Sequence, residues 1–390
     1  MNGVNLLLGH EKINPLPLKT YDDEIINFLN DFSRELMKIK TWPEIVALGF
    51  FCRKGNLEKL RANYPEYKSR LGRGLCFHIA PSNIAVNFAF SYIFGLLSGC
   101  ANVVRVPSKD FEQVSIILSV LEKILTAYPE IYERTQFIKY PSENNLITQE
   151  YSLMSDARLI WGGDETIKKI RSLETKPRCV DISFADRFSV CLIDADAVLK
   201  ADEDELKRLV QNFYNDTFLI DQNACSSPSV IFWLNNNLNA RKKFWSAVNS
   251  YALLKFRVQP AVSVNKLARA CSDAIKLDIK TSRYEEQNLI YLAEINSLDE
   301  NLNVYKFNSG YFYEYALKNL DELFNPEIIN AKFQTLTYYG VNPENLRELV
   351  IKNNLPGFDR ITPIGRALDI NLIWDGFDIV RTLSRIVNKE

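Results

Sequence analysis

The sequence predicts an α/β protein of two domains, each built on a mainly parallel sheet. Three observations predict this class. The chain has 390 residues, too many for one ordinary hydrophobic core. Hydrophobic residues make up 47% and charged residues 24%, which is the balance of a globular protein. Short apolar runs alternate with longer runs of helical periodicity, a pattern typical of a doubly wound sheet.

Strands are predicted where short apolar runs end at turn residues, at 75–79, 102–106, 136–140, 157–161 and 189–193. Helices are predicted where apolar residues recur every three or four positions, at 21–39, 42–60, 84–97, 110–126, 147–154 and 165–173. Because strands and helices alternate, successive strands are expected to run parallel. A charged helix at 201–213 and a strand at 229–233 begin a second region of the same kind, so we expect a domain boundary near residue 200.

Two turns follow predicted strands at the edge where parallel sheets bind ligands. The first contains Pro81, Ser82 and Asn83, and the second contains the pair Gly162-Gly163. A glycine pair lets the backbone approach a phosphate, and the N-terminus of the following helix attracts anions. A tight turn alone also explains the glycine pair, and a helix cap alone also explains Asn83.

Composition argues against several classes of protein. The formal net charge is −1, so no overall basic field draws the chain to nucleic acid or anionic lipid. The most apolar stretch, 84–104, is interrupted by polar residues and glycines, which favours a buried helix over a membrane span. The N-terminus lacks the pattern of a secretory signal. We therefore expect a cytoplasmic protein that neither spans a membrane nor binds nucleic acid.

Cysteines and histidines limit the chemistry further. The seven cysteines are scattered and have no CxxC spacing, so neither a disulfide framework nor a metal site is expected. Of the two histidines, His78 lies in a strand-like apolar run and is interpreted as a core residue. A His-Cys or His-Ser catalytic pair is therefore not expected.

Cys225 differs from the other cysteines. It lies in a polar stretch, Asp-Gln-Asn-Ala-Cys-Ser-Ser-Pro at 221–228, directly before an apolar strand. A nucleophilic cysteine needs partial exposure and a stabilised thiolate, which backbone amides and polar neighbours can provide. Local composition alone leaves two interpretations open, a nucleophile or an incidental cysteine in a turn.

The stretch 221–228 resembles the catalytic loop of the LuxC-type acyl-CoA reductases, a fatty-acyl reductase family of the aldehyde dehydrogenase superfamily. Further segments resemble this pattern in the same order, at 77–83, 95–108, 161–167, 186–189, 357–361 and 374–376. The resemblance implies an α/β, aldehyde dehydrogenase-like fold. It also implies a Rossmann-like cofactor domain at 1–200, a catalytic domain at 201–370 and a C-terminal segment at 371–390.

The resemblance implies that Cys225 takes the acyl group from a thioester and that hydride transfer then releases an aldehyde. It assigns Asn83, with the backbone N–H of Cys225, to the oxyanion hole. It implies a cofactor site formed by Ile79, Ala80, Pro81, Ser82, Arg105, Val106, Pro107, Ser108, Gly162, Gly163, Asp164 and Ile167. Arg105 or Lys109 could meet a 2′-phosphate, which favours NADPH and leaves NADH as the alternative. Arg105 and Val106 should point to opposite faces of the sheet.

One departure from the superfamily pattern bears on the reaction. Hydrolytic aldehyde dehydrogenases carry a glutamate before a glycine pair as the base for water. The matching segment here, 180–185, has neither, and Asp181 is expected to be structural. Reduction of a thioester is therefore favoured over oxidation of an aldehyde to a free acid.

The donor implied by the family is an acyl-CoA or an acyl-protein, with an acyl-protein synthetase as a partner. Two other functions stay open: a CoA-acylating or phosphate-linked semialdehyde dehydrogenase, and a non-catalytic scaffold. Whether the chain forms a homo-oligomer is also left open.

Overall fold

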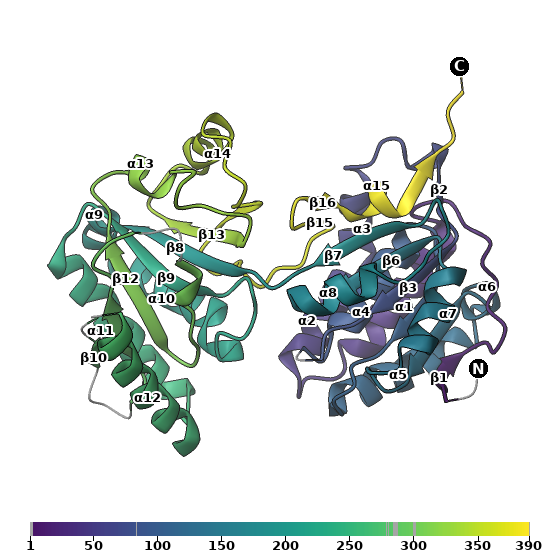
Figure 1. Cartoon of the computed structure of the whole chain (residues 1–390), viewed down its shortest axis with the longest axis horizontal. Coiled ribbons are helices and arrows are strands. Elements are labelled where there is room, and N and C mark those ends of the chain that lie inside the picture. The colour runs from purple at the N-terminus through teal and green to yellow at the C-terminus, as the bar shows by residue number, and fades with distance from the viewer. Residues whose placement is uncertain are drawn as a thin grey trace. The chain divides into compact units, whose positions relative to one another are not determined.

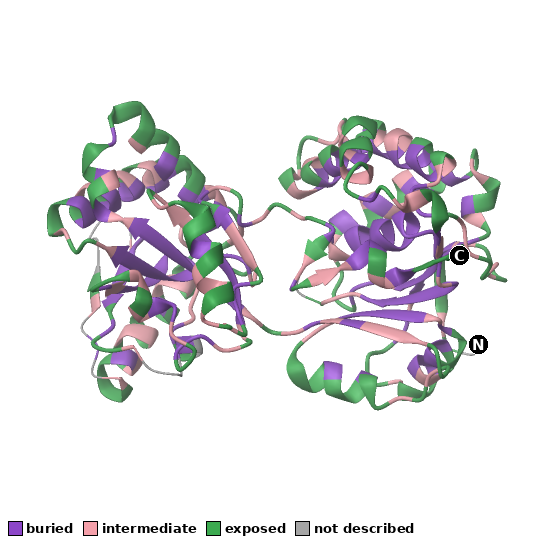
Figure 2. Cartoon of the chain, turned by 90° about the horizontal axis from the view of Figure 1, so that it is seen from above, coloured by how far each residue is buried: buried purple, intermediate pink, exposed green. Residues whose placement is uncertain are grey.

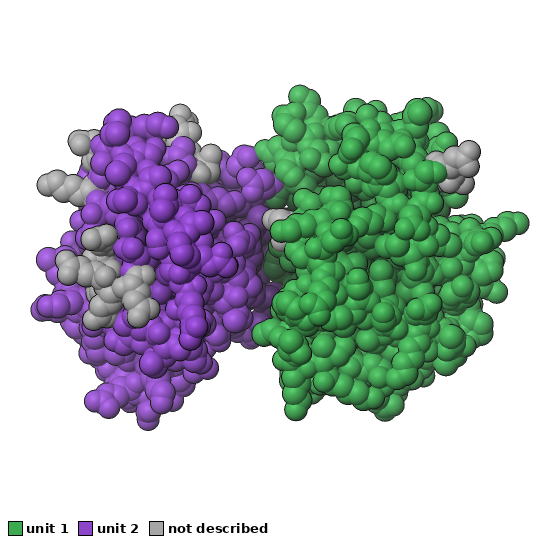
Figure 3. All heavy atoms as spheres, turned by 90° about the horizontal axis from the view of Figure 1, so that it is seen from below, with its two compact units in different colours: residues 1–185, 370–390 green, residues 186–369 purple. Residues whose placement is uncertain are grey.

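The computed structural model describes residues 3–82, 84–277, 279, 281–283, 288–298 and 302–389. The chain divides into two compact units, coloured separately in Figure 3: unit 1 is Met1–Ala185 with Ile370–Glu390, and unit 2 is Asp186–Asp369. The change of unit at residue 185 precedes the boundary expected at 200, because strand β8 (Phe188–Asp194) pairs with strands of unit 2. The segment 371–390, expected to be separate, belongs to unit 1.

Unit 1, which contains the purple N-terminal end of the chain in Figure 1, has a six-stranded sheet in the order β1-β5-β4-β3-β6-β7. Its strands are β1 (Asn5–Gly9), β3 (Leu75–Ile79), β4 (Ala101–Arg105), β5 (Thr135–Lys139), β6 (Ala157–Trp161) and β7 (Val180–Phe184). All neighbours are parallel except β1, which is antiparallel to β5. From β3 the chain builds β4 and β5 on one side, then returns to place β6 and β7 on the other. This confirms the doubly wound sheet and puts its switch point between β3 and β6.

Helices cover both faces of this sheet. They are α1 (Asp23–Leu36), α2 (Pro43–Phe51), α3 (Lys54–Arg61), α4 (Asn87–Leu97), α5 (Glu112–Leu125), α6 (Pro129–Tyr132), α7 (Asn145–Met154), α8 (Asp164–Arg171) and α15 (Ile379–Leu383). Alternate residues of each strand enter different cores: Cys76 and Val104 pack with α1, α4 and α5, whereas Phe77 and Val103 pack with α7 and α8. Both faces of the sheet are therefore buried, as a parallel sheet requires.

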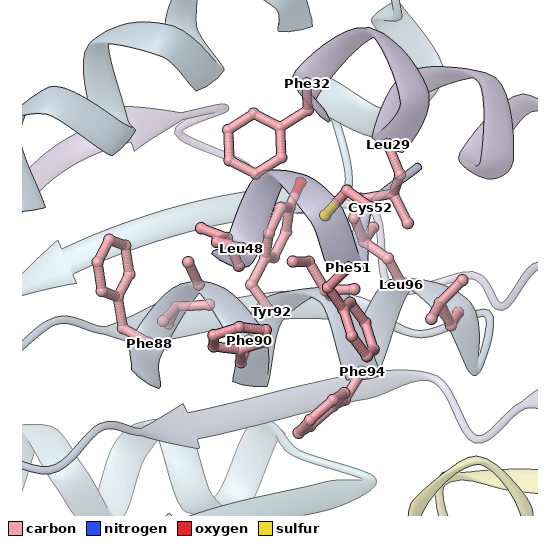
Figure 4. Packing of buried hydrophobic residues seen from close by; sticks show 14 of the residues in the cluster. Leu29, Phe32, Leu48, Phe51, Cys52, Phe88, Phe90, Tyr92, Phe94 and Leu96 are labelled. Atoms are coloured by element: carbon pink, nitrogen blue, oxygen red, sulfur yellow. The ribbon is translucent and has the colours of Figure 1, made fainter. Parts of the chain in front are cut away.

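Helix α4 is the most deeply buried helix of unit 1 and lies between the sheet and helices α1 and α2. Every residue from Phe88 to Leu97 is buried. The rings of Phe90 and Phe94 lie 5.5 and 6.3 Å from the ring of Phe51 on α2 (Figure 4). Burial of each such side chain stabilises the fold by roughly 1.5–3 kcal/mol. The buried helix predicted here is confirmed, although it begins at Asn87 rather than at 84.

Unit 2 contains a seven-stranded sheet in the order β10-β11-β12-β9-β8-β13-β14. Besides β8, its strands are β9 (Pro228–Leu234), β10 (Thr281–Arg283), β11 (Tyr291–Glu294), β12 (Tyr311–Ala316), β13 (Phe333–Tyr339) and β14 (Arg360–Pro363). All neighbours are parallel except β10 and β11. The central strands β8 and β9 are buried except at their last residue, and β12 is buried except at its last two. Figure 2 colours buried residues purple in both units.

The helices of unit 2 are α9 (Ala195–Lys200), α10 (Glu203–Asp216), α11 (Leu238–Lys255), α12 (Pro260–Lys276), α13 (Leu320–Leu323) and α14 (Pro343–Lys352). Helices α9, α10 and α11 pack on one face of the sheet. Helices α13 and α14 pack on the other. Among the described residues of both units, no helix is long and apolar enough to cross a membrane.

The C-terminal segment completes unit 1. It forms the small pair β15 (Ile373–Trp374) and β16 (Phe377–Asp378), and then β17 (Ser384–Ile386), which is antiparallel to β2 (Arg70–Gly72). The buried Arg70 guanidinium donates from Nε to Ser384 Oγ at 2.8 Å and from Nη2 to the Arg381 carbonyl at 2.8 Å. Arg73 Nε donates to the Thr382 carbonyl at 2.6 Å.

Candidate active site

Three neighbouring strands of unit 1 end at the same edge of its sheet. The order β4-β3-β6 with parallel register brings together the segments that follow Ile79, Arg105 and Trp161. These segments contain nearly all the residues expected to form the cofactor site. Ile79, Val106, Pro107 and Ile167 are buried, Ala80, Pro81, Arg105 and Gly162 are half-buried, and Ser82, Ser108, Gly163 and Asp164 are exposed. Asn83 lies outside the described residues.

A buried polar network supports this edge from below. His78 Nε2 lies 2.9 Å from Asn102 Oδ1, and its Nδ1 lies 2.8 Å from Ser91 Oγ. Because the Asn102 amide nitrogen donates to the Cys100 carbonyl, its Oδ1 must accept, so His78 carries its proton on Nε2. Ser91 Oγ then donates to Nδ1 and accepts from Trp161 Nε1 at 3.2 Å. Burial lowers the pKa of His78 to about 4, so the neutral ring is a structural tie between β3, β4, β6 and α4.

The glycine pair stands directly before α8. Gly163 is the N-cap residue of this helix, and no side chain caps it. A Cβ atom on Gly163 would meet nothing within 4 Å, so the backbone there is open. Asp164 and Glu165 occupy the first turn, where negative side chains stabilise the helix dipole. The same carboxylates compete with any phosphate at this helix end.

Arg105 is the cation nearest this edge. Its side chain lies on the sheet face covered by α7 and α8, and Val106 packs in the opposite core, as the alternation predicted. The Arg105 guanidinium lies 4.7 Å from the ring centre of Tyr140, and burial lowers its pKa. Its Nε is buried without a hydrogen-bond partner among the described residues. Lys109 is exposed, with Nζ 5.2 Å from the Phe111 ring.

Cys225 lies in unit 2, on the loop between the 3₁₀ turn Phe218–Ile220 and β9. Its side chain is half-buried. Four of the other cysteines, Cys52, Cys76, Cys100 and Cys191, are fully buried, and burial raises the pKa of each. Burial also raises the pKa of Cys179, to about 11. Cys271 is exposed on α12. Only Cys225 combines partial exposure with a loop at the amino ends of central strands.

Hydrogen bonds from both sides fix the Cys225 loop. On the β8 side, Ser189 Oγ donates to the Cys225 carbonyl at 2.6 Å and accepts from Thr335 N–H at 3.1 Å. On the β12 side, buried Gln222 donates from Nε2 to the Pro228 carbonyl at 3.2 Å and accepts at Oε1 from Gly310 N–H at 2.7 Å. Gln222 lies within the predicted stretch and Ser189 within a resembling segment, but neither was predicted to anchor the loop.

Asp181, in the segment that matches the glutamate base of hydrolytic aldehyde dehydrogenases, is structural, as expected. Arg158 donates from Nε and Nη2 to both carboxylate oxygens of Asp181, at 2.8 and 2.7 Å. Both oxygens of this carboxylate accept from one guanidinium, a geometry that fixes the Asp181 side chain against Arg158. No cluster of three or more His, Cys, Asp or Glu that could hold a metal occurs in the described part of the chain.

The fold is that of the aldehyde dehydrogenases. The chain is similar to glyceraldehyde-3-phosphate dehydrogenase GapN from Methanocaldococcus jannaschii, solved with NADP, with a TM-score of 0.64 at 11% identity over 94% of this chain and 88% of that one. It is also similar to a mutant of 1-pyrroline-5-carboxylate dehydrogenase from Thermus thermophilus, with a TM-score of 0.63 at 13% identity over 95% and 81%.

Within this fold class, the acyl-CoA reductase (LuxC) family model matches residues 17–303, so the chain belongs to the LuxC acyl-CoA reductase family. It is 22% identical over 237 residues to long-chain acyl-protein thioester reductase 2 of Photobacterium leiognathi, covering 56% of this chain and 46% of the relative. It is 22% identical over 168 residues to the long-chain acyl-protein thioester reductase of Aliivibrio fischeri, covering 43% and 33%. The matched stretches therefore span less than half of either relative.

Proposed function

We propose that this chain reduces an acyl thioester to an aldehyde, with NADPH as reductant and Cys225 as the residue that carries the acyl group. The observation that supports this most is the Cys225 loop. It combines a half-buried thiol with a backbone held by Ser189 and Gln222, in a member of the LuxC family. Partial exposure admits a substrate carbonyl, and a fixed backbone keeps the thiol in one position.

In the proposed reaction the Cys225 thiolate adds to the carbonyl carbon of the acyl thioester. The bond from that carbon to the carrier sulfur breaks, the carrier leaves as a thiolate that takes a proton from solvent, and the acyl group remains on Cys225 as a new thioester. The cofactor, if held at the β4-β3-β6 edge by Arg105 and the backbone at Gly163, would supply the hydride that the carbonyl carbon needs. The resulting thiohemiacetal of Cys225 loses its hydroxyl proton and its carbon–sulfur bond breaks, which releases the aldehyde and restores the thiolate. The backbone N–H of Cys225 would hold the oxyanion, and such a donor contributes about 3–4 kcal/mol. The family resemblance proposes Asn83, which lies outside the described residues, as a second donor.

The carboxyl edge at β4-β3-β6 is suited to a dinucleotide. The bare backbone at Gly163 offers a phosphate the start of α8. Arg105 has a buried Nε without a partner among the described residues, and a 2′-phosphate would supply the acceptor that this donor lacks. We therefore assign the adenosine end of the cofactor to Arg105 and favour NADPH over NADH.

We favour reduction over hydrolysis because the segment 180–185 lacks the glutamate with which hydrolytic aldehyde dehydrogenases activate water. Asp181 is the carboxylate nearest that position in sequence, and its oxygens are engaged by Arg158. The Cys225 thioester should therefore persist until hydride or a thiol reaches it. The relatives named above are acyl-protein thioester reductases, so the donor here is proposed to be a long-chain acyl-protein or acyl-CoA, loaded by an acyl-protein synthetase.

The test follows consumption of NADPH and NADH with a panel of acyl-CoAs of increasing chain length. Cys225→Ala is compared with Cys271→Ala, which removes an exposed thiol from the same unit. We expect acyl-dependent oxidation of NADPH in wild type and Cys271→Ala and none in Cys225→Ala. Turnover only with small aldehydes plus phosphate or CoA would establish a semialdehyde dehydrogenase instead. Acyl-dependent activity that survives in Cys225→Ala would refute the mechanism.

A further inference from the structure

The backbone of the Cys225 loop adopts an unfavourable conformation that must be held from outside. Asp221 and Gln222 are consecutive non-glycine residues in the left-handed region, with φ of 53° and 55°. Each such residue costs on the order of a kcal/mol and persists only where its surroundings over-determine it. The conformation here is fixed by the segment 308–310. Ser309 N–H donates to the Asp221 carbonyl at 3.1 Å, and Gly310 N–H donates to Gln222 Oε1 at 2.7 Å.

The segment 308–310 is itself constrained. Ser309 has φ of 56°, and Gly310 has φ of 85°. A Cβ atom on Gly310 would lie 2.2 Å from the Leu289 carbonyl oxygen and 2.8 Å from the Phe218 ring, so only glycine fits. The two N–H groups of this segment that bond the Cys225 loop therefore depend on a tight turn packed against residue 289.

Lys266 of α12 holds that turn in place. Its side chain is fully buried, and Nζ donates to the carbonyls of Leu289 and Ser309, both at 2.9 Å, and to the carbonyl of Asn288. No ion pair to Lys266 occurs among the residues the structure describes, and its ammonium donates to three backbone carbonyls instead. Burial lowers the pKa of Lys266 to about 8, which still leaves the ammonium charged at neutral pH.

We infer that Lys266 is a positioning residue for Cys225. One bonded path leads from its ammonium to the Ser309 carbonyl, from the Ser309 N–H to the Asp221 carbonyl, and so into the loop four residues before the thiol. A buried ammonium costs free energy where no acidic side chain faces it, as holds for Lys266 among the described residues, and the three carbonyl acceptors offset that cost. This inference rests on the proposed function only in assigning Cys225 the nucleophilic role.

The test compares Lys266→Met with Lys243→Met. Lys243 makes a matched set of bonds in the same unit: its Nζ donates to the carbonyls of Val198, Leu199 and Ala201 at 3.0, 3.1 and 2.8 Å, at the C-terminal end of α9. The first readout is the rate at which iodoacetamide alkylates Cys225, measured by mass spectrometry of its peptide in a Cys271→Ser background. The second readout compares the change in kcat for acyl-dependent NADPH oxidation with the change in KM for NADPH.

We expect Lys266→Met to slow alkylation of Cys225 at least fivefold and to lower kcat at least tenfold, with KM for NADPH changed less than twofold. Lys243→Met should leave the alkylation rate within twofold of wild type, even where its melting temperature falls equally. An alkylation rate in Lys266→Met at or above wild type, or an equal loss in both variants, overturns the inference. If Lys266→Met does not fold, Lys266→Gln, which removes the charge but keeps a donor for the carbonyls, is judged by the same criteria. Because alkylation needs no acyl donor, it decides the role of Lys266 even if the proposed reduction is not observed.

Discussion

The hydroxyl of Ser189 donates a 2.6 Å hydrogen bond to the carbonyl oxygen of Cys225 and accepts one of 3.1 Å from the backbone of Thr335. One fully buried side chain thus ties together β8, β13 and the loop that carries the proposed nucleophile. Because β8 and β13 are parallel neighbours, the amino ends of both strands meet at this hydroxyl.

Ser189→Ala should leave the buried Thr335 N–H without its partner, which costs about 1–3 kcal/mol, and release the half-buried Cys225 carbonyl. We expect a lower melting temperature and a loss of acyl-dependent activity larger than the loss of NADPH binding. Thr337→Val is the control, since it removes a hydroxyl bonded to the Val190 carbonyl in the same pair of strands, away from Cys225. Equal effects of the two variants on activity would contradict a specific role for Ser189.

Arg105→Met should weaken NADPH more than NADH. A charge-assisted hydrogen bond to a 2′-phosphate contributes about 1.5–3 kcal/mol, so KM for NADPH should rise roughly ten- to hundredfold, with KM for NADH changed little. Lys109→Met, which removes the exposed cation of the same strand end, should have the smaller effect. Steady-state kinetics with both cofactors checks this, and a matched rise in both KM values would argue against recognition of the 2′-phosphate.

His78 should make unit 1 sensitive to acid. Its pKa is lowered from 6.5 to about 4 by burial, so the folded state resists protonation that the unfolded state accepts. The stability contributed by the neutral ring is complete above pH 6.5 and is lost as pH falls towards 4, a change on the order of 3 kcal/mol. Between pH 6.5 and pH 4 the melting temperature should fall more steeply with decreasing pH in wild type than in His78→Gln. Parallel pH profiles would show that His78 does not titrate as described.

Asp216 should make unit 2 less stable as the pH rises, whereas His78 makes unit 1 less stable as the pH falls. Burial raises its pKa from 3.8 to about 7, although Gly365 and Ala367 N–H groups donate to its carboxylate at 2.6 and 2.9 Å. The folded state binds this proton more tightly than the unfolded state, so the contribution to stability is greatest below pH 4 and is lost as pH rises to 7. The difference in melting temperature between pH 5 and pH 8 should shrink in Asp216→Asn. An unchanged difference would mean that Asp216 is ionised throughout this range.

The central strands of unit 1 could be predicted because their apolar runs and turn residues are local signals. The strands predicted at 75–79 and 157–161 have the bounds of β3 and β6. β1 and β7 were not predicted. β1 is short and obtains its structure from pairing with β5 (Asn5 with Lys139, for example), and β7 is half-exposed at the sheet edge, so neither carries a strong local pattern.

In the candidate site, too, some residues could be predicted from local sequence and others could not. Cys225 was recognisable because small polar residues precede an apolar strand, and the residues of the cofactor edge follow strand ends. Lys266 was not recognisable, since its partners are carbonyl oxygens 22 to 43 residues away, which every sequence supplies equally. Because backbone carbonyls accept its hydrogen bonds, no other position needs a particular residue type. The role of Lys266 can therefore be seen only in the folded chain.

The bond from Arg70 to Ser384 joins residues 314 positions apart, and all of unit 2 lies between them. At a translation rate of about 5–20 residues per second, Ser384 is added roughly 15–60 s after Arg70. Throughout that interval the β2 edge lacks its strand and the Arg70 guanidinium lacks its acceptors, while unit 2 is still being synthesised. The nascent first unit would therefore be the natural client for a chaperone, and slow codons within 186–369 would lengthen its exposure.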